Sequence, residues 1–217
     1  MPFDSSHFRL ELLAPGVYAA VAKPGGWAWS NAGIVDLGGY TLVFDTFFSP
    51  TAGEDLRRAA EIVTGRSVTW VVNSSYRLLH TGGNQAFPNA AVLATAAARQ
   101  LMADRICALM PVWRKNPAPL LEEIRVGAAL NAEDQAGLDR MLLEMLPGLH
   151  VTLPEQTFTG QMELHGTLRS AVIRPIEGHP AGACVLRIPD EEIVFTGSAE
   201  TGEDPARARI VPGQGEL

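Results

Sequence analysis

The strongest constraint on the fold is Val68–Val72 (VTWVV), an unbroken run of β-branched and aromatic residues. Such a run is typical of a strand that is buried on both faces of an α/β sheet. The segment before it is predicted to be a helix, because Ser49-Pro50 is a common helix start and Gly65 a common helix end. A helix that leads into a doubly buried strand indicates a mixed α/β protein.

The other predicted elements follow in the order strands, helix, strand, helices and strands. Strands are predicted at 17–21, 31–37, 41–44, 91–94, 162–164, 170–175, 184–188 and 193–196. Helices are predicted at 95–110, ending at Pro111, and at 131–146, where apolar side chains recur at helical spacing. A connection rich in proline is expected between Pro111 and Pro119. This order predicts a single α/β sandwich domain, residues 1–217, with its helices on the outside.

The composition argues against several classes of protein. The 217 residues have a net charge of −7, whereas nucleic-acid-binding proteins have a basic patch. Two cysteines, Cys107 and Cys184, are too few for a disulfide framework or a cysteine-ligated zinc site. The first residues lack the basic and apolar regions of a signal peptide, and no apolar run reaches the about 18 residues of a membrane span. We therefore expect a cytoplasmic protein without a nucleic acid or a membrane as partner.

Three segments together resemble the metallo-β-lactamase fold family. They are residues 30–46 (SNAGIVDLGGYTLVFDT), 71–87 (VVNSSYRLLHTGGNQAF) and 177–198 (EGHPAGACVLRIPDEEIVFTGS), the last followed by VPGQG at 211–215. The resemblance implies an αβ/βα four-layer sandwich with a metal site where loops leave two facing sheets. Because only about a dozen residues join the last two motifs, we expect an abbreviated C-terminal part. Apolar surface left uncovered there would favour a homodimer.

The central motif of that family is His-x-His-x-Asp-His, directly after a buried strand. In the family this motif binds zinc, which activates a water molecule for hydrolysis. In this sequence Ser75 and Arg77 stand at the positions of the first two histidines, and Leu79 stands at the position of the aspartate. Of this motif only the last histidine is present, as His80. The resemblance also gives Asp45 a structural role, bonding backbone amides near the site.

The downstream motifs are altered in the same way. His179 is the histidine of a Gly-His loop and is still present. Ser198 replaces the bridging aspartate, and Gln214 replaces the last histidine. Metal-ligating side chains therefore remain at His80 and His179 alone, and the resemblance places these two in different metal subsites.

We predict from these replacements a member without metal cofactor and without catalysis. Arg77 is a permanent cation whose planar fork suits a carboxylate or a phosphate. Together the motif positions would form a site for a small anion, or for a protein partner, made of Ser75, Arg77, His80, His179, Ser198 and Gln214. Two simpler interpretations remain open. In one, Arg77 pairs with a nearby carboxylate such as Asp45, and in the other the two histidines only hydrogen-bond to neighbours.

Two enzymatic alternatives also remain. In the first, the chain is a metal-dependent hydrolase whose weakened zinc site uses His80 and His179 or is completed by a partner chain. In the second, Ser75 or Ser198 is a nucleophile paired with one of these histidines, and Asp45 orients the imidazole. No G-x-S-x-G elbow supports the second alternative.

Overall fold

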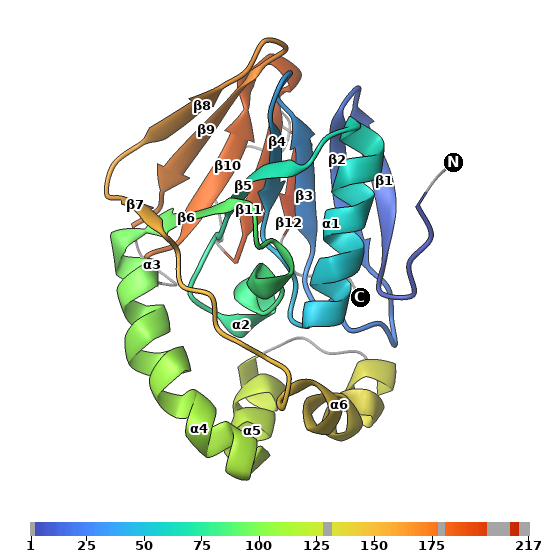
Figure 1. The fold of residues 1–217 in the computed structure, drawn as a ribbon, viewed down its shortest axis with the longest axis vertical. Coiled ribbons are helices and arrows are strands. Elements are labelled where there is room, and N and C mark those ends of the chain that lie inside the picture. The colour runs from blue at the N-terminus through green and yellow to red at the C-terminus, as the bar shows by residue number, and fades with distance from the viewer. Residues whose placement is uncertain (1–2, 128–131, 178–180, 199–208, 213–217) are drawn as a thin grey trace.

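Two facing β-sheets and a group of helices at one edge make up the molecule (Figure 1). The computed structural model describes residues 3–127, 132–177, 181–198 and 209–212. The N-terminal half supplies most of the first sheet, and the C-terminal part supplies the second. The predicted mixed α/β sandwich is therefore confirmed.

The first sheet has seven strands in chain order, so each strand lies beside its neighbour in sequence. The strands are β1 (Phe8–Ala14), β2 (Val17–Ala22), β3 (Ala32–Asp36), β4 (Thr41–Phe44), β5 (Val68–Val72), β6 (Ala91–Thr95) and β7 (Gln156–Phe158). Strands β1 to β4 pair antiparallel, and β4 to β7 pair parallel. The run at Val68–Val72 thus lies inside the parallel half, as its composition predicts.

The second sheet has the order β12-β11-β10-β9-β8. Its strands are β8 (Met162–His165), β9 (Ser170–Pro175), β10 (Cys184–Ile188), β11 (Ile193–Gly197) and β12 (Arg209–Pro212). All neighbours pair antiparallel except β11 and β12, which are parallel. Residues 199–208 between these two strands lie outside the described residues, so the predicted shortening of the C-terminal part stays a prediction from chain length.

The main core lies between the two sheets, because alternate residues of each strand point to opposite faces. In β5, Val72 belongs to the cluster between the sheets, and Val71 belongs to the cluster under the first helix. Phe44 of β4 and Phe195 of β11 meet across the main core with ring centroids 6.1 Å apart. The two sheets are therefore held at the same ends from which the candidate site is built.

Helix α1 (Pro50–Thr64) covers the other face of the first sheet. The Ser49 hydroxyl accepts a hydrogen bond from the Ala52 N–H, and Gly65 ends the helix with φ 69°. Both ends therefore match the sequence prediction, and the apolar stripe of the helix is buried.

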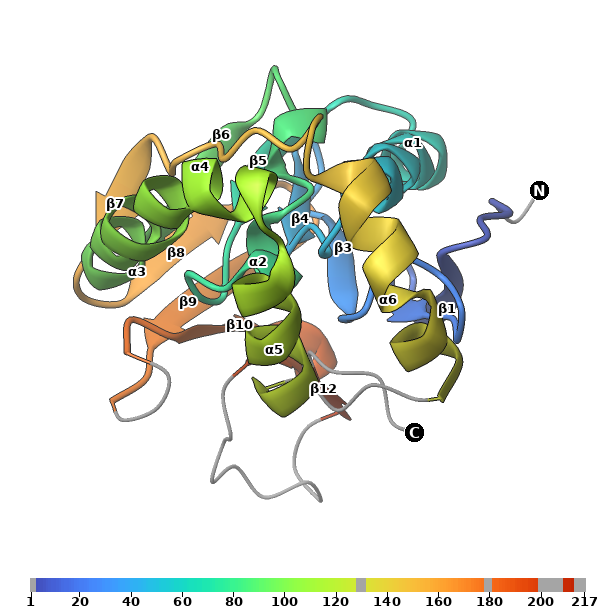
Figure 2. The same ribbon diagram turned by 90° about the horizontal axis from the view of Figure 1, so that it is seen from below.

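The remaining helices cluster beyond the lower edge of the sheets (Figures 1 and 2). They are α3 (Ala96–Leu101), the π-helix η2 (Met102–Cys107), α4 (Ala108–Lys115), α5 (Ala118–Gly127) and α6 (Ala132–Met145). The short elements are α2 (Leu78–Thr81) and the 3-10 helices η1 (Asn84–Ala86) and η3 (Pro189–Glu191). Nowhere in the described ranges is a helix both long and apolar enough to cross a membrane.

The prediction that a helix ends at Pro111 is wrong, because α4 continues through this proline to Lys115. Proline removes the hydrogen bond to the carbonyl four residues earlier, which belongs to Cys107. Cys107 is the last residue of the π-helix, where the hydrogen-bond ladder is already irregular. Burial of Met110 and Trp113 favours the continued helix.

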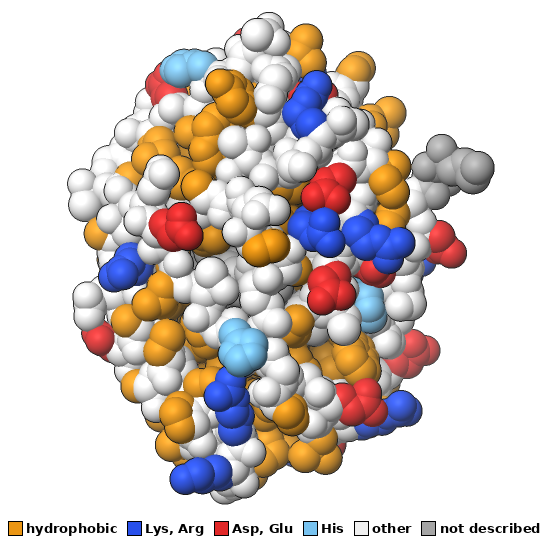
Figure 3. All heavy atoms as spheres, in the orientation of Figure 1, with side chains coloured by type: hydrophobic (Ala, Val, Ile, Leu, Met, Phe, Trp, Pro, Cys, Tyr) orange, Lys and Arg blue, Asp and Glu red, His pale blue; other side chains and the backbone are white. Residues whose placement is uncertain are grey.

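Charged side chains of both signs are mixed on the face drawn in Figure 3. Lys and Arg side chains there lie among Asp and Glu side chains instead of forming one positive field. This agrees with the net charge of −7 and gives no support for a nucleic-acid surface on that face.

Candidate functional site

The motif loop, residues 73–84, follows β5 and is fixed at both ends by buried amides. The side chains of Asn73 and Asn84 donate to each other in two hydrogen bonds of 2.9 Å. The Thr46 hydroxyl donates to the side-chain oxygen of Asn84, which also accepts from Asn73, at 2.8 Å. Because buried polar groups are stable only with partners, this network fixes the loop against the segment after β4.

Two glycines allow the motif loop to approach that segment closely. A Cβ atom on Gly82 would lie 1.8 Å from the Phe48 carbonyl oxygen, and one on Gly83 would lie 2.0 Å from the Thr46 carbonyl oxygen. Real side chains do not reach such distances to backbone atoms. The close packing therefore requires glycine at both positions.

Asp45 is the fully buried centre of the candidate site. Its backbone has φ 62°, an uncommon value for a residue with a side chain. One carboxylate oxygen accepts from the Ser74 N–H at 2.7 Å, and the other accepts from the Ser74 hydroxyl at 2.7 Å. Asp45 thus bonds the backbone of the motif loop, in the structural role that the resemblance implies.

His80 completes this group of hydrogen bonds. Its Nδ1 lies 2.8 Å from Asp45 Oδ2, the oxygen that also accepts from the Ser74 hydroxyl. Both the imidazole ring and the carboxylate are completely buried. Because a carboxylate accepts, Nδ1 is the nitrogen that donates, and Nε2 bears the lone pair in a neutral ring. Nε2 is buried and has no hydrogen-bond partner in the described part of the chain.

The ends of β10 and β11 pack against the same group. At Gly197, where φ is 56°, a Cβ atom would lie 2.1 Å from the Ser74 Cβ. The next residue, Ser198, has a buried hydroxyl without a partner among the described residues. The Cys184 thiol donates to the Asn73 carbonyl at 3.4 Å, and burial followed by the Asp45 charge raises the pKa of this thiol. The candidate site thus combines both sheets.

Ser75 and Arg77, which stand at the positions of the first two histidines of the family motif, have different surroundings. The Ser75 side chain is completely buried, and its hydroxyl accepts from the Arg77 N–H at 3.3 Å. Arg77 is half-buried, and its guanidinium forms no ion pair within the described ranges. The interpretation in which Arg77 pairs with Asp45 is wrong, because Ser74 and His80 are the partners of that carboxylate.

Two of the predicted site residues, His179 and Gln214, lie outside the described residues. Of the described site residues, His80 bonds to Asp45 directly. Ser198 lies near Asp45 because the residue before it, Gly197, packs against Ser74 and Asp45. In the serine-hydrolase alternative a serine hydroxyl bonds to an imidazole nitrogen. Within the described ranges His80 Nε2 has no such partner, and Ser75 bonds to backbone instead.

A pocket of about 160 Å³ lies between the motif loop and the helices. The loop supplies one wall, and η2, α4 and α5 supply the opposite wall. The lining residues are Phe48, Tyr76, Arg77, Leu78, Leu79, Ile106, Trp113, Leu120, Glu123 and Ile124. We call this the helix-side pocket. Among the described residues of its lining, Arg77 is the one cationic residue.

Sequence reasoning did not identify the helical wall of this pocket. Leu120 and Ile124 are four residues apart, which is a weak helical signal. Pro117 and Pro119 made the segment look like a connection, although α5 begins at Ala118. Prolines are tolerated in the first turn of a helix, where the N–H has no helical partner.

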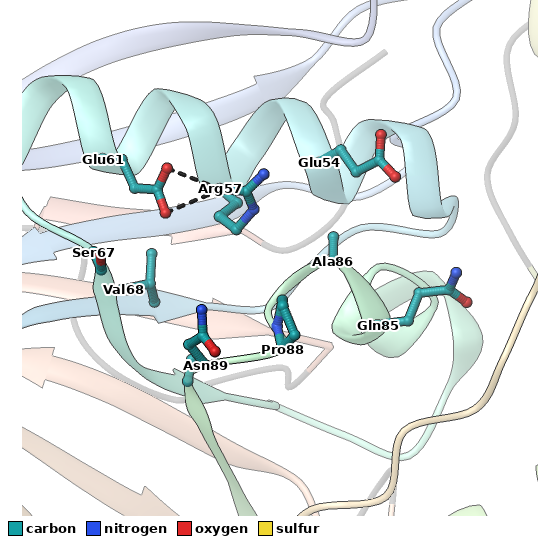
Figure 4. A pocket seen from close by; sticks show the side chains of 10 residues that line it. Glu54, Arg57, Glu61, Ser67, Val68, Gln85, Ala86, Pro88 and Asn89 are labelled. Carbon is teal, nitrogen blue, oxygen red and sulfur yellow. Dashed lines mark hydrogen bonds and ion pairs between the residues drawn. The ribbon is translucent and has the colours of Figure 1, made fainter.

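A second hollow of about 260 Å³ lies between α1 and η1 (Figure 4). Arg57 and Glu61 of its lining pair with each other, because the Arg57 guanidinium donates to both carboxylate oxygens of Glu61 at 3.0 and 2.9 Å. The other side chains around it are short or neutral, with the exception of Glu54. None of its described lining residues belongs to the motif loop, so this hollow is not part of the candidate site.

The described residues do not fit the zinc centre that the resemblance implies. Zinc in proteins takes three or four ligands from histidine, cysteine and carboxylate groups. No group of three such residues lies together within the described ranges. Leu79 packs in an apolar cluster with Trp29 and Phe48, so its position offers no ligand. Among the described motif residues, His80 alone has a free ligating atom, Nε2.

Comparison with known proteins identifies the family of the chain. The model of the metallo-beta-lactamase superfamily matches residues 25–215. Because the match spans most of the chain, the protein belongs to the metallo-beta-lactamase superfamily. The predicted αβ/βα sandwich of that type is therefore confirmed.

Several solved structures share the fold at low sequence identity. A metallo-beta-lactamase from Pontibacter korlensis is 14% identical, with a TM-score of 0.65 over 96% of this chain and 92% of that one. The metallo-beta-lactamase FIM-1 from Pseudomonas aeruginosa, in its mono-zinc form, is 15% identical, with a TM-score of 0.63 over 99% and 90%. An enzyme from Hirschia baltica is 13% identical, with a TM-score of 0.61 over 97% and 92%. No curated protein sequence matches the chain.

Proposed function

We propose that the protein is a non-hydrolytic member of its superfamily that binds a small anion through Arg77. The observation that supports this most is the position of Arg77. This residue lines the helix-side pocket and is half-buried, and its guanidinium has no ion-pair partner in the described part of the chain. A guanidinium cannot lose its proton in a protein, so a partly desolvated one attracts an anion.

The loss of hydrolysis is inferred from the motif loop. Activation of water by zinc needs a ligand set that holds the ion with an open position. The buried Ser75 hydroxyl accepts a hydrogen bond from the backbone, and Leu79 packs among apolar side chains. A fixed positive charge at position 77 also opposes a nearby divalent cation.

A second candidate is a metal-dependent hydrolase, and one contact favours it. Metal-ligating histidines usually donate their second ring nitrogen to a carboxylate, as His80 does to Asp45. Such a site would need further ligands from His179 or from a partner chain. Hydrolysis of β-lactam, thioester and lactone substrates, measured with and without added zinc, distinguishes the two candidates.

Isothermal titration tests the anion site directly. Untagged protein is titrated with phosphate, acetate and benzoate, alongside Arg77→Gln. The control is Arg140→Gln, which removes an exposed guanidinium of α6 that is not among the lining residues. We expect at least one anion to bind and Arg77→Gln to weaken it by about ten-fold or more, the worth of a charged hydrogen bond. Equal affinities for the wild type and Arg77→Gln would contradict the proposal.

A further inference from the structure

The helix-side pocket has two charged lining residues of opposite sign. They are Arg77 of the motif loop and Glu123 of α5. Within the described ranges neither forms an ion pair, and they do not pair with each other, although both face one pocket. A salt bridge would bring their charged atoms within 4 Å, so the two groups are held further apart than that.

The remaining lining residues are mostly apolar and buried. The aliphatic and aromatic side chains at most 8% exposed are Phe48, Leu78, Leu79, Ile106, Trp113, Leu120 and Ile124. The volume is about 160 Å³. An apolar cavity of about 150 Å³ accommodates a molecule of the size of benzene. The pocket thus suits one compact apolar group, with a cation and an anion beside it.

We propose that this pocket binds a free apolar α-amino acid, an inference that rests on the proposed anion site at Arg77. The ligand carboxylate would bind the Arg77 guanidinium, and the ligand ammonium would bind the Glu123 carboxylate. The ligand side chain would lie among the apolar residues. A simple monocarboxylate would pair with Arg77 but would leave Glu123 unpaired and be repelled by it. A simple amine would pair with Glu123 but would leave Arg77 unpaired and be repelled by it. A zwitterion compensates both charges.

The cavity size sets the expected preference among amino acids. Leucine, isoleucine and phenylalanine fill the apolar volume, whereas alanine leaves most of it empty. Each methylene buried adds about four-fold in affinity. Tryptophan exceeds the volume and forces the walls apart, which is unfavourable in a packed interior.

The test compares three ligands that differ by one charged group. Leucine is titrated beside 4-methylpentanoate, which lacks the ammonium, and 3-methylbutan-1-amine, which lacks the carboxylate. The variants are Arg77→Gln and Glu123→Gln, with Arg140→Gln as the control. Circular dichroism checks that each variant is folded, and both pocket substitutions lie on side chains that are not in the core.

We expect leucine to bind the wild type about ten-fold or more tightly than either analogue, since each lost charged contact has that worth. Glu123→Gln should bind leucine and 4-methylpentanoate equally, and Arg77→Gln should lose both. If 4-methylpentanoate binds the wild type as tightly as leucine, in a manner that depends on Arg77, the amino-acid inference is wrong and the anion site stands. If Arg77→Gln keeps the affinity of the wild type, both are wrong.

Discussion

His80 Nδ1 lies 2.8 Å from a carboxylate oxygen of Asp45, and both side chains are completely buried. This hydrogen bond joins the residue after β4 to the motif loop. The same carboxylate also accepts two hydrogen bonds from Ser74. The loop therefore has protein contacts of its own that hold it in place.

Removing the Asp45 carboxylate should destabilise the fold. Asp45→Ala leaves the Ser74 N–H and the His80 ring buried without their acceptor. Each buried donor left without its acceptor costs about 1–3 kcal/mol, so we expect a loss of at least that size. Urea unfolding measures the loss. The control is Asp139→Ala, which breaks a pair with Arg125 at an exposed position and should cost less than about 1 kcal/mol. Equal losses for the two variants would contradict the role given to Asp45.

Two glycine substitutions should change stability in opposite directions. Gly83→Ala places a methyl group against the Thr46 carbonyl, which is backbone and cannot move aside cheaply. We expect a loss of about 1–3 kcal/mol or more from this overpacking. Gly137→Ala, in α6 with open space around the position, should gain about 0.5–1 kcal/mol. Thermal unfolding of both variants checks the signs, and an unaffected Gly83→Ala would show that the loop is not closely packed.

The two thiols should react with a disulfide reagent at very different rates. Burial and the Asp45 charge raise the pKa of Cys184, while partial burial alone raises the pKa of Cys107. A raised pKa leaves less thiolate, the reactive form, and Cys184 is in addition inaccessible. In the native Cys107→Ser variant we expect no labelling of Cys184 until a denaturant is added. Rapid labelling of the native variant would place Cys184 at the surface instead.

His7 should make the protein less stable in mild acid. Desolvation lowers the pKa of His7, although the Asp55 charge acts in the opposite direction. The unfolded chain, with a pKa near 6.5, then binds the proton more readily than the folded chain. The His7 contribution to stability is therefore present above about pH 6.5 and lost as the pH falls below it.

The measurement for His7 is the free energy of unfolding from pH 8 down to pH 5. The Trp27 backbone N–H donates to His7 Nδ1 at 3.2 Å, and a proton on Nδ1 would remove this acceptor. His7→Gln should show a smaller fall than the wild type across this range. The exposed His165→Gln variant is the control. A wild-type curve parallel to that of His7→Gln would exclude this contribution.

The sequence predicts every interior strand but only one of the four edge strands, β8, among the described residues. Val68–Val72 is buried in the middle of the first sheet, so its composition is dominated by the core. Strands β1, β7 and β12 were not predicted, and each lies at the edge of a sheet. Edge strands are partly exposed, and β7 has only three residues, so the alternation of apolar side chains is weak.

The candidate site was predicted in part. The family motif gives Arg77, His80 and Ser198 as candidates, because those positions follow strands in a fixed order, and their role in a site stays a prediction. It did not show that the Arg77 side chain lies beside helices, since helix packing is a tertiary property. Glu123 belongs to α5, and Pro117 and Pro119 at the start of this helix make its sequence look like a connection. Opposite charges that are distant in sequence give no local signal.

The central claim is that the motif loop has an anion-binding arginine in place of a metal site. The most direct measurement is the metal content of untagged protein, by elemental analysis after expression in medium supplemented with zinc, iron and manganese. We predict far less than one metal ion per chain, unchanged by Arg77→Gln. A metal content close to one ion per chain that survives dialysis would contradict the claim.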